Sequence, residues 1–102
     1  MHLKLSEVAK RDLIGITDYY SEISTTLAGR FVDETSSALN QLYHQPNLGS
    51  PRYAHFLADQ SLRVWQLDHF PFLVFYRLGG KSLEVLRVLH ERRDLSADLI
   101  AR

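Results

Sequence analysis

The feature that most constrains this chain is a long apolar run interrupted only by a pair of glycines. The segment FLVFYRL, residues 72–78, is apolar at almost every position, as expected for a strand that is covered on both faces. Gly79 and Gly80 then offer the backbone freedom that a tight hairpin turn needs, and SLEVLRVLH, residues 82–90, reads as a second strand. The run therefore predicts a β-hairpin within a sheet.

The N-terminal half predicts two helices. Ser6 is a good N-cap residue, and an apolar stripe at helical spacing follows it over about residues 7–23. A second stripe covers about residues 26–44 and ends before Pro46, which cannot continue a helix. The short polar connection predicts an antiparallel helical hairpin. The two stripes are Ala9, Leu13, Ile16, Tyr20 and Ile23, and Ala28, Phe31, Thr35, Leu39 and Leu42.

Two further strands complete the expected fold. HLKL, residues 2–5, alternates in polarity, and SLRVWQLDHF, residues 61–70, alternates imperfectly, which suggests a bulge. Between them PNLGSPR, residues 46–52, is a loop because of its two prolines and its glycine. The order β-α-α-β-β-β predicts an α+β fold in one domain, residues 1–102, with a helical hairpin packed on one antiparallel sheet.

Composition excludes several classes of function. The chain has 102 residues, 12 basic and 12 acidic side chains, and no cysteine, so disulfides and thiolate metal sites are excluded. The zero formal net charge argues against broad coating of nucleic acid. The histidines lie far apart, and there is no phosphate-binding glycine loop. We therefore expect no metal, no cofactor, no membrane span and a cytoplasmic protein.

A charged cluster, HERRD at residues 90–94, closes the last predicted strand. One interpretation is a metal-free ribonuclease site, in which His90 moves a proton while Arg63, Arg87, Arg92 and Arg93 hold a phosphodiester. The other is an ordinary strand exit, in which Arg92 or Arg93 pairs with Asp94 or Asp98. Residue types alone favour the strand exit.

The chain also carries more apolar residues than one helical stripe and one sheet face need. Exposed apolar patches commonly mark sites where a partner binds. We therefore expect a patch on the surface, and Tyr19 of the first helix is a further candidate for a partner contact. The residues expected to contribute to the patch are Val8, Ile14, Val32, Leu57, Trp65 and Leu67.

Several segments together resemble a known family. FPFLVFYRLGGKSLEVLRVLHERRDL, residues 70–95, looks very like the ending of ParE-type toxins, with an aromatic strand, a glycine turn and a last strand closing as VLRVLHERRD. AKRDLIGITDYY, residues 9–20, is similar to the first helix of that family, and PNLGSPR is similar to its loop. The resemblance covers nearly the whole chain and points to the ParE/RelE superfamily of type II toxin–antitoxin systems.

The resemblance implies a toxin that inhibits DNA gyrase by binding and lacks catalysis of its own. It implies a cognate, ParD-like antitoxin with a C-terminal segment that wraps the toxin and orders on binding. Neither a cofactor nor direct sequence-specific binding of nucleic acid is expected. The residues expected to contact the target or the antitoxin are Tyr19, Arg87, His90, Glu91, Arg92 and Arg93.

Two alternatives stay open within the superfamily. RelE-type members cut messenger RNA on the ribosome, and here such an activity would use His90, Arg92, Arg93 and Arg63. However, the region of Asp98 lacks the tyrosine that RelE-type nucleases carry, and Lys81 is the only lysine near the middle strands. The other alternative is a member that has lost toxicity and only binds an antitoxin.

Overall fold

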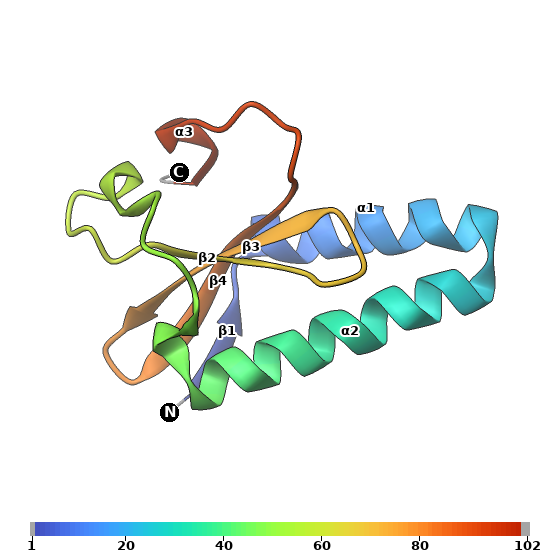
Figure 1. Ribbon diagram of the computed structural model, residues 1–102, viewed down its shortest axis with the longest axis horizontal. Helices are drawn as coiled ribbons and strands as arrows, with labels where there is room; N and C mark the ends of the chain where they lie inside the picture. The colour runs from blue at the N-terminus through green and yellow to red at the C-terminus, as the bar shows by residue number, and fades with distance from the viewer. Residues whose placement is uncertain (1, 101–102) are drawn as a thin grey trace.

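The computed structural model describes residues 2–100 and confirms the α+β class and the predicted order of elements (Figure 1). Within the described residues, a short C-terminal helix, α3, and two 3-10 turns were not predicted. The elements are β1 (His2–Leu5), α1 (Glu7–Ile23), α2 (Thr25–His44), β2 (Arg63–Gln66), β3 (Phe72–Gly79), β4 (Ser82–His90) and α3 (Ala97–Ile100), with 3-10 turns at Pro46–Leu48 and Ala54–Phe56.

The four strands form one sheet in the order β1-β4-β3-β2. Strands β2, β3 and β4 pair antiparallel, as predicted, but β1 pairs with β4 in parallel. The sheet is therefore mixed, which corrects the expectation of an antiparallel sheet. Alternation in HLKL could not show this, because a four-residue strand far from its partner in sequence has no hairpin turn that fixes its direction.

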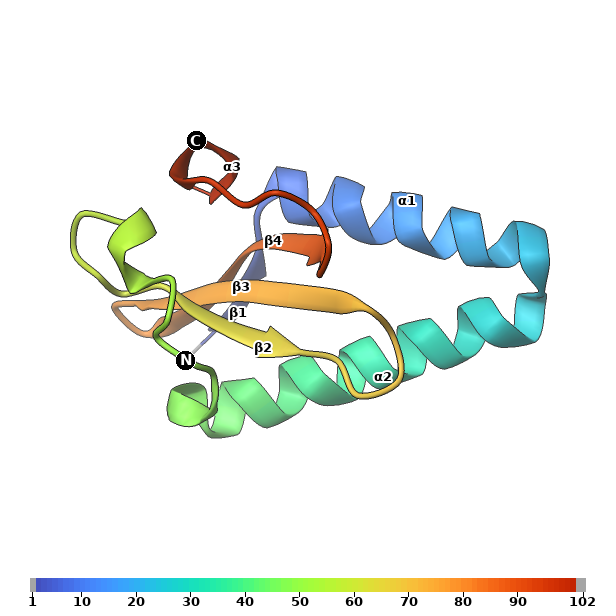
Figure 2. The ribbon, with the colours of Figure 1, turned by 45° about the horizontal axis from the view of Figure 1, so that its top comes forward.

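One serine joins the two long helices. Ser24 ends α1, where its backbone N–H donates to the carbonyl of Tyr20, and its side chain accepts from the N–H of Leu27 to cap α2. At the other end of α1, Ser6 caps the helix as predicted, accepting from the N–H of Ala9. This tight connection folds the helices into a hairpin whose tip extends past the end of the sheet (Figures 1 and 2).

The helical hairpin packs on one face of the sheet, as predicted. Ala9 of α1 and Phe31 and Leu42 of α2 are buried against Val74 and Val85 of the central strands. The other face is also covered, as the apolar run of residues 72–78 predicted, although the sequence did not identify the segments that cover it. The residues 53–62 and 95–100 pack there on Leu73 and Phe75 of β3. Both faces of β3 are therefore buried, in agreement with its apolar sequence.

The expected apolar patch is only partly confirmed. Val8, Ile14 and Val32 are exposed on the helices. Leu57 and Leu67 are buried, and Trp65 is half-buried against the helix-side core, so these three do not form the patch. Leu57 lies in the loop that covers the second sheet face, and no sequence pattern assigned that loop to the cover.

The sheet contains a bulge, but not in the segment where it was expected. Strand β2 is short, and the register shifts instead where Phe75 and Tyr76 of β3 pair with β4, leaving Leu86 as the extra residue. Val85 and Val88 both contribute to the helix-side core although they are three residues apart. In a regular strand, side chains alternate between the two faces, so residues three apart lie on opposite faces. The bulge is what places both side chains on the same face.

A polar clasp holds the loop after α2 against the sheet. The hydroxyl of Tyr76 accepts from the N–H of Gly49 at 2.8 Å and donates to the carbonyl of Pro46 at 2.6 Å. A side chain at Gly49 would collide with the ring of Tyr76. Arg63 donates to the carbonyl of Gly49 at 2.6 Å. Arg63 therefore has a structural task at this end of the sheet.

Candidate functional site

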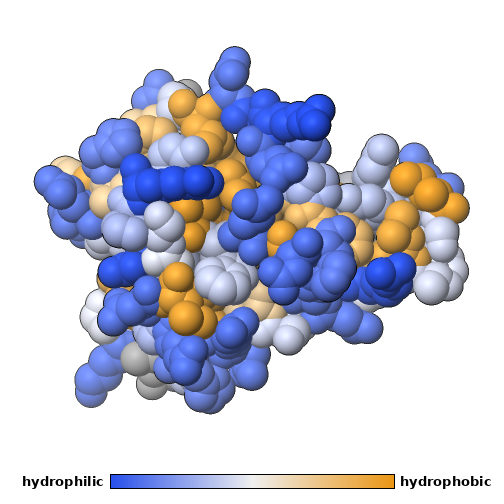
Figure 3. All heavy atoms as spheres, viewed as in Figure 1, coloured by the Kyte–Doolittle hydropathy of each residue, from blue (hydrophilic) through white to orange (hydrophobic). Residues whose placement is uncertain are grey.

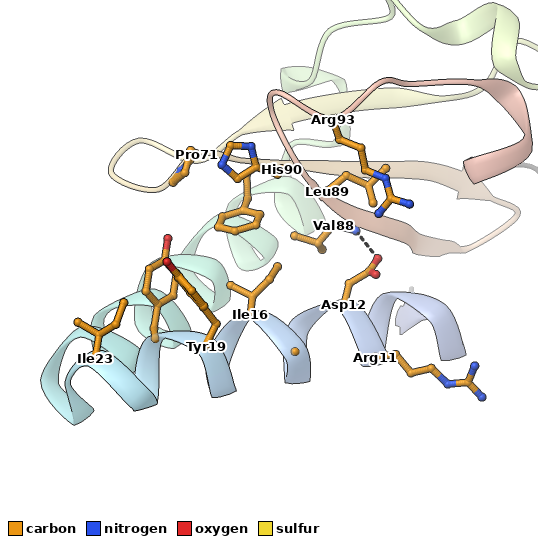
Figure 4. A pocket seen from close by; sticks show the side chains of 13 residues that line it. Arg11, Asp12, Ile16, Tyr19, Ile23, Pro71, Val88, Leu89, His90 and Arg93 are labelled. Carbon is orange, nitrogen blue, oxygen red and sulfur yellow. Dashed lines mark hydrogen bonds between the residues drawn. The ribbon is translucent and has the colours of Figure 1, made fainter.

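A groove runs between α1 and the end of the sheet where β3 begins and β4 ends (Figure 4). We call it the α1 groove, and its volume is about 630 Å³. One wall is α1 from Arg11 to Ile23, and the other consists of residues 71–72 and 88–90, with Arg93 beyond them. It brings together parts of the chain that are far apart in sequence.

Tyr20 and Phe72 form the floor of the groove and belong to an aromatic cluster that continues beneath it with Phe31 and Phe70. The ring of Tyr20 lies 5.2 Å from that of Phe70 and 5.6 Å from that of Phe31, measured between ring centres. Phe72 continues the cluster toward the imidazole of His90, with a separation of 5.4 Å. Burial, with a smaller contribution from Tyr19, raises the pKa of Tyr20 above its ordinary value. The floor is therefore uncharged at any physiological pH.

The rim of the groove exposes large apolar side chains. Tyr19 and Ile23 of α1 are each 60% exposed and lie one helical turn apart. Figure 4 shows both on the helix wall of the groove, and Figure 3 shows hydrophobic atoms at the surface around the tip of the hairpin. An apolar rim above an aromatic floor is a surface suited to a protein partner.

Positive charge borders this apolar surface. Arg11 and Arg93 both line the groove, and within residues 2–100 neither side chain forms a hydrogen bond or an ion pair. The one acidic lining residue, Asp12, is already paired with Arg87. The border of the groove therefore carries unpaired positive charge.

A tight turn positions His90 and the arginines after it. The N–H of Arg92 donates to Nδ1 of His90 at 3.1 Å, and the N–H of Arg93 donates to the carbonyl of His90 at 3.0 Å. Because Nδ1 accepts, the proton of a neutral imidazole is on Nε2. His90 in this state offers a proton donor and lacks the free acceptor that a general base needs.

The predicted site residues divide into two groups. Tyr19, His90 and Arg93 come together at the α1 groove, and Arg92 lies exposed on the same turn. Glu91 points elsewhere, because its carboxylate accepts from the amide of Gln66 at 2.6 Å. The pairing of Arg92 or Arg93 with Asp94 or Asp98 is absent from the part of the chain that the structure describes.

Arg63 and Arg87 do not join this turn. Arg63 is opposite Tyr76 on β3, whereas His90 is opposite Phe72, so they are about 13 Å apart along the strand. Arg87 donates to both carboxylate oxygens of Asp12, at 2.8 and 3.0 Å, and to the carbonyl of Leu99. In this structure Arg63 and Arg87 are therefore not gathered around His90, and both are held by bonds to other parts of the chain.

The Asp12–Arg87 pair is the feature that sequence reasoning missed. Each side chain is 14% exposed, and Oδ2 of Asp12 also accepts from the N–H of Val88 beside the bulge. This pair joins α1, β4 and α3 at one end of the groove. The available signal was the place of Asp12 next to Leu13 in the apolar stripe of α1, where a charged residue needs a partner.

Other kinds of site find no support in the described residues. Within residues 2–100 no three histidine, aspartate or glutamate side chains lie close enough together to hold a metal ion. None of the helices there is long and apolar enough to cross a bilayer.

Comparison with known proteins places the chain beside one protein family and its solved structures. The sequence profile of the ParE toxin of the type II toxin–antitoxin system parDE matches residues 3–95. Among solved structures, a chain of the chromosomal ParDE toxin–antitoxin system from P. aeruginosa superimposes with a TM-score of 0.73 at 26% sequence identity, covering 88% of this chain and 95% of that one. A comparison with curated proteins gave no match.

Proposed function

This chain belongs to the ParE toxin family of type II toxin–antitoxin systems, and we propose from this premise that it inhibits DNA gyrase by binding it and is neutralised by a cognate antitoxin. The observation that carries the proposal is the exposed turn His90–Arg93 beside an apolar groove, in a chain whose profile match covers residues 3–95. Because gyrase acts on the chromosome, the proposed action takes place in the cytoplasm.

The chemistry of the turn supports binding rather than catalysis. Metal-free RNA cleavage needs an acceptor, a donor and cations placed around one phosphate. Here the free nitrogen of His90 is a donor, and Arg63 and Arg87 are held in bonds to other parts of the chain. Arg92 and Arg93 are exposed and form no ion pair within residues 2–100, so they can meet an acidic surface of a protein target.

In this proposal the surface that binds gyrase consists of the turn His90–Arg93 and of Tyr19 across the groove. It comprises Tyr19, His90, Arg92 and Arg93, with Glu91 at its edge. Arg87 is left out because its guanidinium is occupied by Asp12 and Leu99. An antitoxin that covers the α1 groove also covers this turn. The bound antitoxin therefore neutralises the toxin by blocking its contact with the target.

Removing both arginines of the turn should weaken inhibition of gyrase. Arg92→Ala combined with Arg93→Ala removes two exposed charges. We expect this variant to fold, and we expect the concentration that half-inhibits supercoiling to rise about tenfold. The matched control, Arg30→Ala with Lys81→Ala, removes two exposed charges from α2 and the β3–β4 turn. Equal inhibition by both double variants would exclude the turn as the target surface.

A further inference from the structure

Charge is distributed unevenly along this molecule, although its formal net charge is zero. One end is formed by β1, residues 44–63 and residues 77–84, and the opposite end is the tip of the helical hairpin (Figures 1 and 2). Residues 18–34 at the tip carry four carboxylates and one arginine. The first end, which we call the basic end, carries two carboxylates and five cations, namely Lys4, Arg52, Arg63, Arg77 and Lys81.

Two of these cations flank one carboxylate on the second sheet face. Lys4 of β1 and Arg77 of β3 both pair with Glu84 of β4, so the three side chains project from the same side of the sheet. Phe75, two residues before Arg77, projects from that side too and packs under the cover of the second face. Arg77 forms an ion pair with Glu84 at 2.9 Å, whereas Lys4 forms none within residues 2–100. The single carboxylate therefore leaves a positive charge unbalanced.

A third cation adjoins this row from the loop. The ring of Tyr53 lies 5.8 Å from that of Phe75 and is stacked on Phe56 at 5.3 Å, measured between ring centres. The guanidinium of Arg52 lies over the ring of Tyr53, 5.0 Å from its centre. Arg52 is exposed and forms no ion pair in the part of the chain that the structure describes. The ring holds this guanidinium in place, which reduces the entropy that it loses when it binds an anion.

The spread of the three cations indicates an extended anion. Lys4 and Arg77 are on strands separated by β4, about 10 Å apart, and Arg52 lies beyond Arg77 on the loop. Duplex DNA carries one charge per about 1.7 Å of its axis, so it matches such a row better than a single small anion does. The rings of Tyr53 and Phe56 pack on each other and on β3. This surface therefore offers charge and lacks the open aromatic platform on which unpaired bases stack.

We propose that the basic end binds the phosphates of double-stranded DNA, with Lys4, Arg52 and Arg77 as the central contacts. Phosphate contacts carry no sequence information, so this binding is independent of sequence. The turn His90–Arg93 follows the opposite end of β4, about 26 Å away, so a bound duplex leaves the proposed gyrase-binding surface open. The inference goes beyond the proposed function and does not rest on it.

Fluorescence anisotropy of a short labelled duplex, titrated with the purified protein, tests this inference. About four phosphate contacts predict that the affinity falls ~100-fold when the salt concentration rises about fourfold. A second duplex of unrelated sequence should bind equally well.

Two double variants of equal net charge locate the site. Lys4→Gln combined with Arg52→Gln removes two contacts without breaking an ion pair. The slope of log affinity against log salt should decrease by about two, and the affinity at low salt should fall about tenfold or more. Arg11→Gln combined with Arg30→Gln removes two exposed cations from the helices and should change the affinity by less than about twofold. Both should melt within about 3 °C of the wild type.

Four results would overturn the inference. Equal weakening by the two double variants would show that total charge attracts the DNA. Loss of binding when Arg92 and Arg93 are replaced would place the DNA at the turn. A wild-type protein that leaves the duplex free at low salt has no such site. Binding of anionic lipid vesicles in preference to the duplex, lost when Lys4 and Arg52 are replaced, would identify a membrane surface as the ligand. None of these measurements includes gyrase or the antitoxin, so the proposed function is judged separately.

Discussion

Expression of this chain without its antitoxin should stop growth, and the viable count should fall by orders of magnitude. The reason is the exposed, positively charged turn beside the α1 groove, which is free to bind the target when no partner covers it. Co-expression of the antitoxin encoded in the neighbouring reading frame should restore growth, because it covers the groove. Colony counts after induction, with and without the antitoxin, measure both effects.

Two controls make this result specific. The double variant Arg92→Ala with Arg93→Ala should accumulate to the same level and allow more growth than the wild type. The pair Arg30→Ala with Lys81→Ala should remain fully toxic. If the wild-type protein accumulates in folded form and growth continues without the antitoxin, the chain is a non-toxic member of its family.

Replacing Asp12 should cause the largest loss of stability among the variants considered. Asp12→Ala leaves the largely buried guanidinium of Arg87 without its carboxylate and the N–H of Val88 without its acceptor. The hydrogen bond with Asp12 raises the pKa of Arg87 in the wild type. Without Asp12 an arginine still stays charged near neutral pH, so deprotonation cannot relieve the loss. We expect a decrease of about 3 kcal/mol in the free energy of unfolding.

Denaturant titration and thermal melting measure this loss. For a domain of this size the expected drop in melting temperature is about 12 °C or more. Asp12→Asn keeps an oxygen for the N–H of Val88 and should lie between alanine and the wild type. Glu7→Ala removes an exposed pair with Lys10 on the same helix, so it should change stability by less than about 1 kcal/mol. Equal stability of the Asp12 and Glu7 variants would contradict the structural role of the buried pair.

The elements of this fold could be predicted where the pattern is local. The apolar stripes of the helices, the Ser6 cap and the glycine turn at Gly79–Gly80 each depend on residues a few positions apart. The parallel pairing of β1 with β4 and the cover on the second sheet face depend on contacts between distant segments. No periodicity within a short window contains that information.

The site was predictable to the same degree. The cluster at residues 90–94 stood out because charge follows an apolar strand, and it does border a groove. The roles of Arg87 and Arg63 could not be read from residue type, since a free arginine and a paired one look the same in a sequence. The spacing of Val85 and Val88 indicates the bulge. The two residues are three apart, and a regular strand would place them on opposite faces, yet both lie in the same core.

The most direct test of the central claim is a DNA supercoiling assay with purified gyrase and the purified protein. Binding to gyrase predicts that supercoiling falls as the protein is added, that equimolar antitoxin restores it, and that ribosome-bound messenger RNA stays intact in a parallel reaction. Undiminished supercoiling together with cleavage of the messenger, abolished by His90→Ala in a protein that still binds its antitoxin, would contradict the account.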